Sequence, residues 1–187
     1  LDLVTPCGKP ADTAGLEGSN VDLDCGVMVA TLGRNTAALE VLNERFPEVD
    51  VIRLGLAESL LAEQQFDRAN ALLSPLIRSM KEDSAPWRLR FKTAYATGNW
   101  KEALTAGERV KRMDPDRLAL RLAHAEVLLK VEGRGADAHT EYESILAHPN
   151  GAALPDQPRL LTDAAAAALL AGDASREAKR AEPGLEI

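Results

Sequence analysis

The sequence predicts an all-α fold, a right-handed α–α superhelix (solenoid) of about four helical hairpins that follow an extended N-terminal arm. Two observations predict it. Apolar residues recur at helical spacing in paired segments separated by short turns, and the features of one pair return about 34 residues away. The composition agrees, since 45% of the residues are hydrophobic and only 4% aromatic, which is typical of helices rich in Ala and Leu.

The clearest hairpin runs from Trp87 to Pro115. Its two helical segments meet at Gly98 and Asn99, where glycine permits the left-handed backbone of a helix end, and Pro115 cannot continue the second helix. The apolar residues of each segment share one helical face: Trp87, Phe91, Ala94 and Tyr95 in the first, and Trp100, Ala103, Leu104, Gly107 and Val110 in the second. The stretch is therefore expected to form an antiparallel hairpin.

This stretch resembles a tetratricopeptide repeat (TPR), a family whose signature is a regular period of about 34 residues. The positions that carry the resemblance are Trp87, Tyr95, Gly98, Trp100, Ala103 and Pro115. The resemblance implies that two helices, A and B, make up each repeat and that stacked repeats bury one continuous core.

The period extends to both sides of this repeat. Phe66 and Ala69 lie one period before the aromatic residue and the alanine of helix B, and Pro149 lies one period after the closing proline. The earlier repeat has Gln64 in place of the turn glycine. The later repeat has a turn, at 132–135, that is one residue longer than expected.

The predicted organisation is an extended arm at residues 1–20 and a TPR-like solenoid at residues 21–182. The arm contains several glycines and prolines and no apolar period. The expected hairpins cover residues 21–47, 50–83, 84–116 and 117–149, and a capping hairpin is expected at 158–182. In that last hairpin, Gly172 is the expected turn and Asp173 the expected cap of a short final helix.

Charge and hydropathy restrict the kinds of partner that this protein is expected to bind. The net charge of −7 disfavours a nucleic-acid partner, because phosphate binding needs a basic face, and it equally disfavours an anionic membrane surface. No stretch approaches the roughly 20 apolar residues of a membrane span, so direct membrane insertion is not expected.

Two cysteines, Cys7 in the arm and Cys25 at the start of the first helix, leave two interpretations open. A disulfide between them would tie the arm to the solenoid, with a stabilisation of roughly 3 kcal/mol, and would favour an oxidising compartment such as a bacterial periplasm or cell envelope. Two unrelated thiols, with Cys25 a small buried residue, would favour the cytoplasm. Two thiols alone are too few ligands for a metal site.

The TPR resemblance implies a partner-binding groove lined by helix A of each repeat. The outward helix-A positions are Leu54, Glu58 and Leu61, then Arg88, Lys92 and Tyr95, then Leu122, Glu126 and Leu129. This set forms an apolar strip with one basic patch, which would suit a peptide that places an acidic group on Arg88 and Lys92. The alternative for these two cations is an ordinary solvated helix surface. The groove lacks the asparagine of the family's carboxylate clamp, so a chaperone-tail receptor is disfavoured.

Catalysis, cofactors and metals have little support in the sequence. There is no nucleophile elbow, no Gly-rich phosphate loop and no HExxH motif. His139 and Glu143 lie four residues apart on a helix, which is a common arrangement and a weak metal signal. We therefore expect no enzyme activity, no cofactor and no metal.

The sequence is compatible with two functions. The first is a non-catalytic scaffold that binds a protein or peptide partner through the groove, in a bacterial cell-envelope assembly for secretion, export or polymer synthesis. The alternative is a regulatory or adaptor TPR domain of a larger cytosolic enzyme, chaperone or signalling protein. Self-association into a homo-oligomer, through the groove or the ends of the solenoid, stays open.

Overall fold

The computed structural model describes residues 35–151 and 157–181, and within these ranges all regular secondary structure is helical. The chain divides into two compact units, residues 1–93 and 94–187, with the boundary inside helix α5. Each unit is described separately below.

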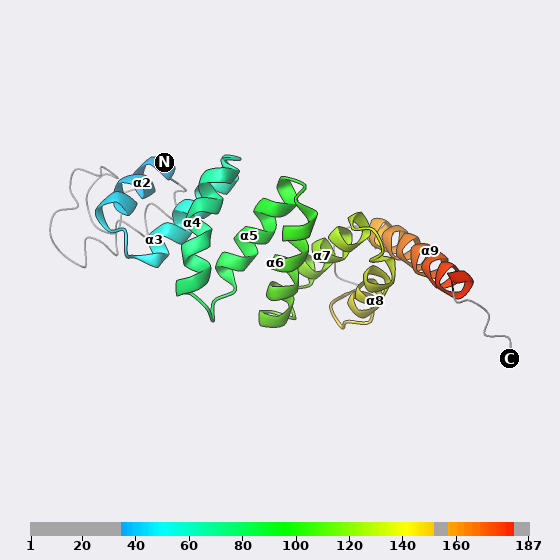
Figure 1. Ribbon diagram of the computed structural model, residues 1–187. Coiled ribbons are helices and arrows are strands. Elements are labelled where there is room, and N and C mark those ends of the chain that lie inside the picture. The colour runs from blue at the N-terminus through cyan, green and yellow to red at the C-terminus, as the bar shows by residue number, and fades with distance from the viewer. Residues whose placement is uncertain (1–34, 152–156, 182–187) are drawn as a thin grey trace. The chain divides into compact units, whose positions relative to one another are not determined.

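The described part of the first unit contains three complete helices and most of a fourth: α2 (Thr36–Arg45), α3 (Asp50–Ala62), α4 (Phe66–Ser79) and α5 (Ala85–Ala96) (Figure 1). The Asn35 side chain accepts a hydrogen bond of 3.1 Å from the Ala38 amide, which satisfies one of the free N–H groups at the start of α2. Apolar residues at helical spacing on α2 and α3 face each other, and they form part of the core of this unit.

Among the described residues of this unit, two clusters of buried side chains contribute to the core. The first joins α2, α3 and the start of α4 through Leu39, Leu42, Ile52, Leu56, Leu60 and Ala69. The second joins α3, α4 and α5 through Ala57, Leu73, Leu76 and Leu89. Helices α3 and α4 both contribute to the two clusters, so this helix pair connects them.

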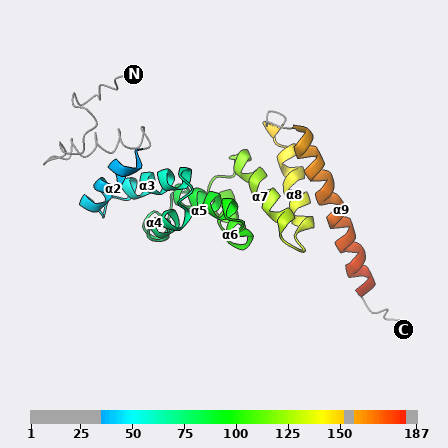
Figure 2. The same ribbon diagram turned by 90° about the horizontal axis from the view of Figure 1, so that it is seen from above.

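The second unit holds α6 (Trp100–Met113), α7 (Leu118–Lys130), α8 (Gly135–Leu146) and α9 (Gln157–Ala181), and Figures 1 and 2 show the last three side by side. Asn99 caps α6: its side chain accepts from the Glu102 amide at 3.3 Å and donates to the Glu102 carboxylate at 3.0 Å. The helix therefore begins directly after the predicted turn.

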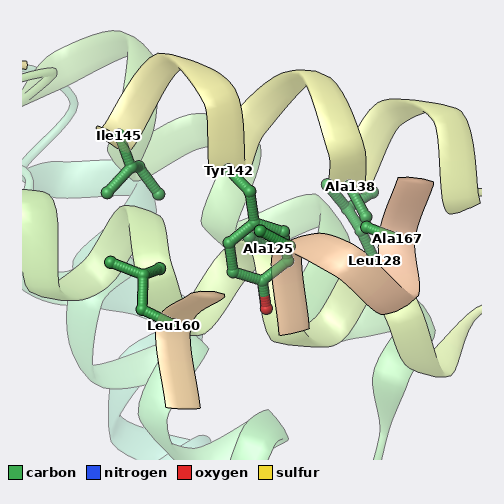
Figure 3. Close-up of a cluster of buried hydrophobic side chains, with 8 residues drawn as sticks. Ala125, Leu128, Ala138, Tyr142, Ile145, Leu160 and Ala167 are labelled. Carbon is green, nitrogen blue, oxygen red and sulfur yellow. The ribbon is translucent and has the colours of Figure 1, made fainter. Parts of the chain in front are cut away.

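A core cluster of the second unit lies between α7, α8 and α9 (Figure 3). Its buried residues are Ala125, Leu128, Ala138, Tyr142, Ile145, Leu160, Ala164 and Ala167. Small residues allow the helices to approach closely. A Cβ atom on Gly135 would lie 2.6 Å from Leu170 Cβ and 3.2 Å from the Leu170 carbonyl carbon, so only glycine fits where α8 begins against α9.

The predicted all-α fold of helical hairpins is confirmed. The expected hairpin ranges 50–83, 84–116 and 117–149 contain the pairs α3 and α4, α5 and α6, and α7 and α8. Of the range 21–47, the described residues include the second helix, α2. The arm at 1–20 and both cysteines lie outside the described residues, so the Cys7–Cys25 disulfide stays a prediction.

The C-terminal segment differs from the expected capping hairpin at 158–182. A single helix, α9, runs from Gln157 to Ala181 and passes through the expected turn at Gly172 and Asp173. Gly172 does not adopt the left-handed backbone that a hairpin turn would need. A glycine inside a helix costs only about 1 kcal/mol relative to alanine, and the preceding alanine-rich run strongly favours helix. The cost is therefore too small to end the helix at Gly172.

The turns between paired helices repeat with the predicted spacing. Gln64, Gly98 and Gly133 adopt positive φ angles of 61°, 69° and 76°. The first two lie one repeat period apart, and the last two lie one residue further apart than that, which matches the insertion expected in the turn at 132–135. Gln64 thus adopts the left-handed backbone conformation that glycine adopts in the other two turns.

Replacing Gln64 with glycine is expected to raise the free energy of unfolding by about 0.5–1 kcal/mol. A left-handed backbone costs an L-residue about 1–2 kcal/mol, and the greater freedom of glycine in the unfolded chain offsets part of the gain. Urea denaturation followed by far-UV circular dichroism measures the change. The control Gln64→Ala should give no gain, and Gly98→Ala should lower stability by about 1–2 kcal/mol. A destabilised Gln64→Gly protein would contradict the assignment of this turn.

Candidate functional site

In the first unit, the predicted groove residues divide between core packing and solvent. Leu54 and Leu61 are half-buried against the second cluster of that unit, and Glu58 is exposed. Arg88 donates a hydrogen bond of 2.6 Å to the Ser84 hydroxyl, one turn earlier on the chain, and Lys92 is exposed. The two leucines therefore serve the core at least in part. The role of the cationic pair in binding an acidic group stays a prediction.

In the second unit, two predicted groove residues meet directly. The Tyr95 hydroxyl on α5 donates a hydrogen bond of 2.6 Å to Glu126 Oε2 on α7. The Tyr95 ring also lies edge-on to Trp100, with 5.9 Å between the centroids. The other two predicted residues, Leu122 and Leu129, are half-buried against the core of this unit. A polar contact thus links the A helices of two successive repeats.

Helix α9 extends this contact to a third helix. Arg159 Nη2 lies 3.1 Å from Glu126 Oε1, and Arg159 Nε lies 3.6 Å from Asp163 Oδ2. We call Tyr95, Glu126, Arg159 and Asp163 the Tyr95–Asp163 cluster. Sequence reasoning missed its last two members. The signal that was present is a pair of opposite charges four residues apart near the start of the C-terminal helix.

A buried hydroxyl lies next to the cluster. Tyr142 on α8 is fully buried, and its hydroxyl has no hydrogen-bond partner. Figure 3 shows its ring extending from α8 into the space between α7 and α9. Burial raises the pKa of Tyr142 well above its usual value, and the carboxylates of Asp163 and Glu126 raise it further. A buried hydroxyl without a partner costs free energy, so this one is a candidate contact for a ligand or an ordered water.

The pKa of Tyr95 also lies above its usual value. The hydrogen bond to Glu126 is the largest cause, and partial burial adds to it. The hydroxyl therefore keeps its proton at neutral pH and acts as a donor to the carboxylate. The cluster as a whole combines two carboxylates, one guanidinium and one phenol, and each of these groups can donate or accept hydrogen bonds.

A second polar network lies between α6, α7 and α8. Glu141 is buried and pairs with Lys111 and with Arg121, whose Nε lies 2.6 Å from Glu141 Oε1. Arg121 also donates to the Ser144 hydroxyl at 2.8 Å. Burial alone would raise the pKa of Glu141, but the hydrogen bonds from Lys111 and Arg121 outweigh it and hold the pKa below its usual value. The buried carboxylate is therefore ionised and structural.

His124 lies near this network and is poorly placed for catalysis. It is 4% exposed, and neither ring nitrogen has a hydrogen-bond partner. Burial is the largest cause that lowers its pKa, and Lys111 and Arg134 lower it while Glu141 and Glu108 act in the opposite direction. The imidazole is thus held neutral away from solvent.

Acidification is expected to destabilise the fold through His124. The unfolded histidine takes up a proton below about pH 6.5, whereas the buried ring resists protonation, so the free energy of unfolding should fall by up to about 1 kcal/mol between pH 7 and pH 5.5. Urea denaturation at both pH values tests this. His124→Leu should remove most of the pH-dependent loss, and the partly exposed His148→Gln should leave it in place. An unchanged loss in His124→Leu would show that other groups cause it.

Among residues 35–151 and 157–181, no three His, Cys, Asp or Glu side chains are grouped so that they could hold a metal ion. None of the helices in these ranges is long and apolar enough to cross a membrane.

Comparison with known proteins supports the fold. No protein-family model matches the sequence, and no curated protein has a matching sequence. Similar solved structures include "MamA MSR-1 C2", with a TM-score of 0.60 at 18% identity over 83% of this chain and 95% of that chain. They also include TTC0263, a thermophilic TPR protein of Thermus thermophilus, with a TM-score of 0.50 at 20% identity over 87% of this chain and 91% of that chain. By its fold, the chain is a TPR-like helical repeat protein.

Proposed function

We propose that this protein is a non-catalytic scaffold that binds a protein or peptide partner through the outward faces of its A helices. The observation that supports this most is the Tyr95–Asp163 cluster, in which side chains of α5, α7 and α9 meet at the surface. Its polar groups are only partly buried, so a partner can reach them. The TPR-like fold supports the same proposal, because helical repeats present extended binding surfaces.

Position-specific crosslinking tests this proposal. A photoreactive residue at Ala166 would lie on the face of α9 that carries Arg159 and Asp163, because these positions are spaced by four and three residues. The matched control is Glu143, an exposed position on α8. In the native cell, crosslinking at Ala166 should yield one dominant protein adduct that disappears when Tyr95 is also changed to alanine. Equal adducts at Glu143, or none at Ala166, would overturn the proposed binding face.

The proposed setting is a bacterial cell-envelope assembly for secretion, export or polymer synthesis. The support is the pair Cys7 and Cys25 and the Gly- and Pro-containing arm that holds the first of them. Intact mass after alkylation under denaturing, non-reducing conditions tests it on protein from its native compartment. Unmodified cysteines and a mass lower by two hydrogens would support an oxidising compartment. Alkylation of both thiols would instead favour the cytosolic adaptor.

A further inference from the structure

Helix α9 carries an apolar face that none of the described helices of its unit covers. Its buried side packs against α7 and α8 in the core cluster of that unit. On another side of the helix, Leu161 and Leu169 are 56% and 72% exposed. Ala165, Ala168 and Gly172 share this side, because they follow Leu161 at steps of three or four residues. We call these five residues the open face of α9. None of them is charged, and contiguous exposed apolar surface is typical of interaction sites.

The buried residues of α9 establish its register in the repeat. Ala164 and Ala167 belong to the core cluster of this unit. One 34-residue period and six residues earlier lie His124 and Val127, which are also buried, on α7. The additional six residues fall in the segment between α8 and α9. Helix α9 therefore begins as helix A of a further repeat.

The same register shows which contact the open face lacks. Ala125 and Leu128 of α7 are buried in one cluster with Tyr142 of α8, which is helix B of that hairpin. Their counterparts on α9 are Ala165, which is exposed, and Ala168, which is half-buried. The open face is thus the side on which a helix B packs in the preceding hairpin, and no described helix occupies it here.

The chain contains a segment that suits this position. Gly172 lies two periods and the same six residues after the turn residue Gly98, so it falls at the turn position of the repeat. Residues 173–181 follow where a helix B would begin, and Ala174, Ala178 and Ala181 recur in them at helical spacing. Small residues on one side allow two helices to approach closely. Figure 2 shows that this segment continues α9 without turning back, so it does not cover the open face of its own chain.

We propose that this protein forms a two-fold dimer in which residues 173–181 of each copy pack on the open face of the other. The two α9 helices then lie antiparallel about Gly172, and each copy supplies the helix B that the last hairpin of the other lacks. Exchange of an identical element between two copies is a low-cost route to a dimer. This inference goes beyond the proposed partner binding and does not depend on it.

Charge supports a second copy as the occupant. In an antiparallel pair centred on Gly172, Lys179 and Arg180 of one copy reach the level of Asp163 on the other. There, the two carboxylates of the Tyr95–Asp163 cluster share a single guanidinium, so this end of the open face has a net negative charge. Opposite charges at the two ends of the contact favour this register.

Sedimentation velocity on the purified full chain tests the dimer. The mass should increase from that of one chain, 20.1 kDa, toward twice that value as the concentration rises from about 1 µM to about 200 µM. A single-chain mass over the whole range overturns the proposal. The measurement needs no partner, so either result leaves the partner binding proposed for the Tyr95–Asp163 cluster to its own crosslinking test.

Two pairs of variants test the faces that meet. Leu169→Gln should raise the dissociation constant of the dimer at least about tenfold, and the control Val51→Gln, at a site that is 57% exposed on α3, should leave it unchanged. Ala178→Gln should also raise it about tenfold, because a longer side chain separates the helices, whereas Arg176→Gln, on the other side of the segment, should not. Circular dichroism confirms that each variant is folded. Unchanged dimerisation by Leu169→Gln or by Ala178→Gln overturns the exchange.

Gly172→Ala tests the continuous helix that the exchange requires. Gly172 does not have a left-handed backbone, and an added Cβ atom would meet nothing within 4 Å. Alanine also favours a continuous helix by about 1 kcal/mol over glycine. The variant should therefore dimerise at least as strongly as the wild-type protein. Loss of the dimer would show that α9 turns at Gly172 in the assembly, and it would overturn the proposed arrangement.

Discussion

Replacing Tyr142 with alanine will lower the free energy of unfolding by about 3–5 kcal/mol, because it removes a large side chain from a core that cannot fully collapse around the cavity. Tyr142 is fully buried, and it packs between α7, α8 and α9 with Ala125, Ala138 and Ala167 around it. These neighbours are small, so none of them can extend to fill the space. The midpoint of urea denaturation, followed by circular dichroism, measures the loss.

The companion substitution Tyr142→Phe should behave in the opposite way. It keeps the ring and removes only the hydroxyl, which is buried without a hydrogen-bond partner. Stability should therefore stay unchanged or rise by up to about 1 kcal/mol. The matched control is Tyr95→Phe, which loses a real hydrogen bond to Glu126 and should lower stability by about 1 kcal/mol. A loss above about 1 kcal/mol in Tyr142→Phe would show that the hydroxyl has a hydrogen-bond partner.

The hairpins were predictable because two of these turns contain a glycine and the 34-residue period locates the third. Gly98 and Gly133 provide the left-handed turn residue from their own chemistry, and Gln64 was assigned to the same role only because it lies one period before Gly98. The final helix was mispredicted because Gly172 and Asp173 resemble a turn and cap locally. Helix propensity over the preceding alanine run outweighed that local signal.

The candidate site was only partly predictable. The 34-residue repeat period placed Tyr95 and Glu126 on outward faces of neighbouring A helices, and the structure brings them into contact. Arg159 and Asp163 were missed because the loop after Pro149 breaks the period, so no register was available to place them. The two cationic partners of the buried Glu141 were unpredictable for another reason. Which charges meet between two helices depends on their crossing angle, and the sequence does not encode that angle locally.

That buried carboxylate supports the second large prediction. Arg121→Ala should lower the free energy of unfolding by about 2–4 kcal/mol, because it leaves Glu141 buried with one of its two cationic partners removed. Glu141 and the side chain of Arg121 are 3% and 11% exposed, whereas that of Lys111 is 42% exposed. Lys111→Ala should therefore cost less than about 1 kcal/mol. Comparable losses in the two single variants would contradict this ranking of the two partners.

Two further measurements distinguish the effect of an unpaired buried charge from the effect of lost side-chain packing. The double variant Arg121→Leu with Glu141→Leu should recover most of the stability, because no charge then remains buried. Acid provides the other measurement. The wild-type protein gains stability from the lowered pKa of Glu141 only above about pH 4.5, so this contribution disappears as pH falls further. In Arg121→Ala the same carboxyl is more easily protonated. The difference in the free energy of unfolding between this variant and the wild type should therefore narrow between pH 6 and pH 4. A gap that stays constant over this range would mean that Arg121 acts through its aliphatic packing rather than through its charge.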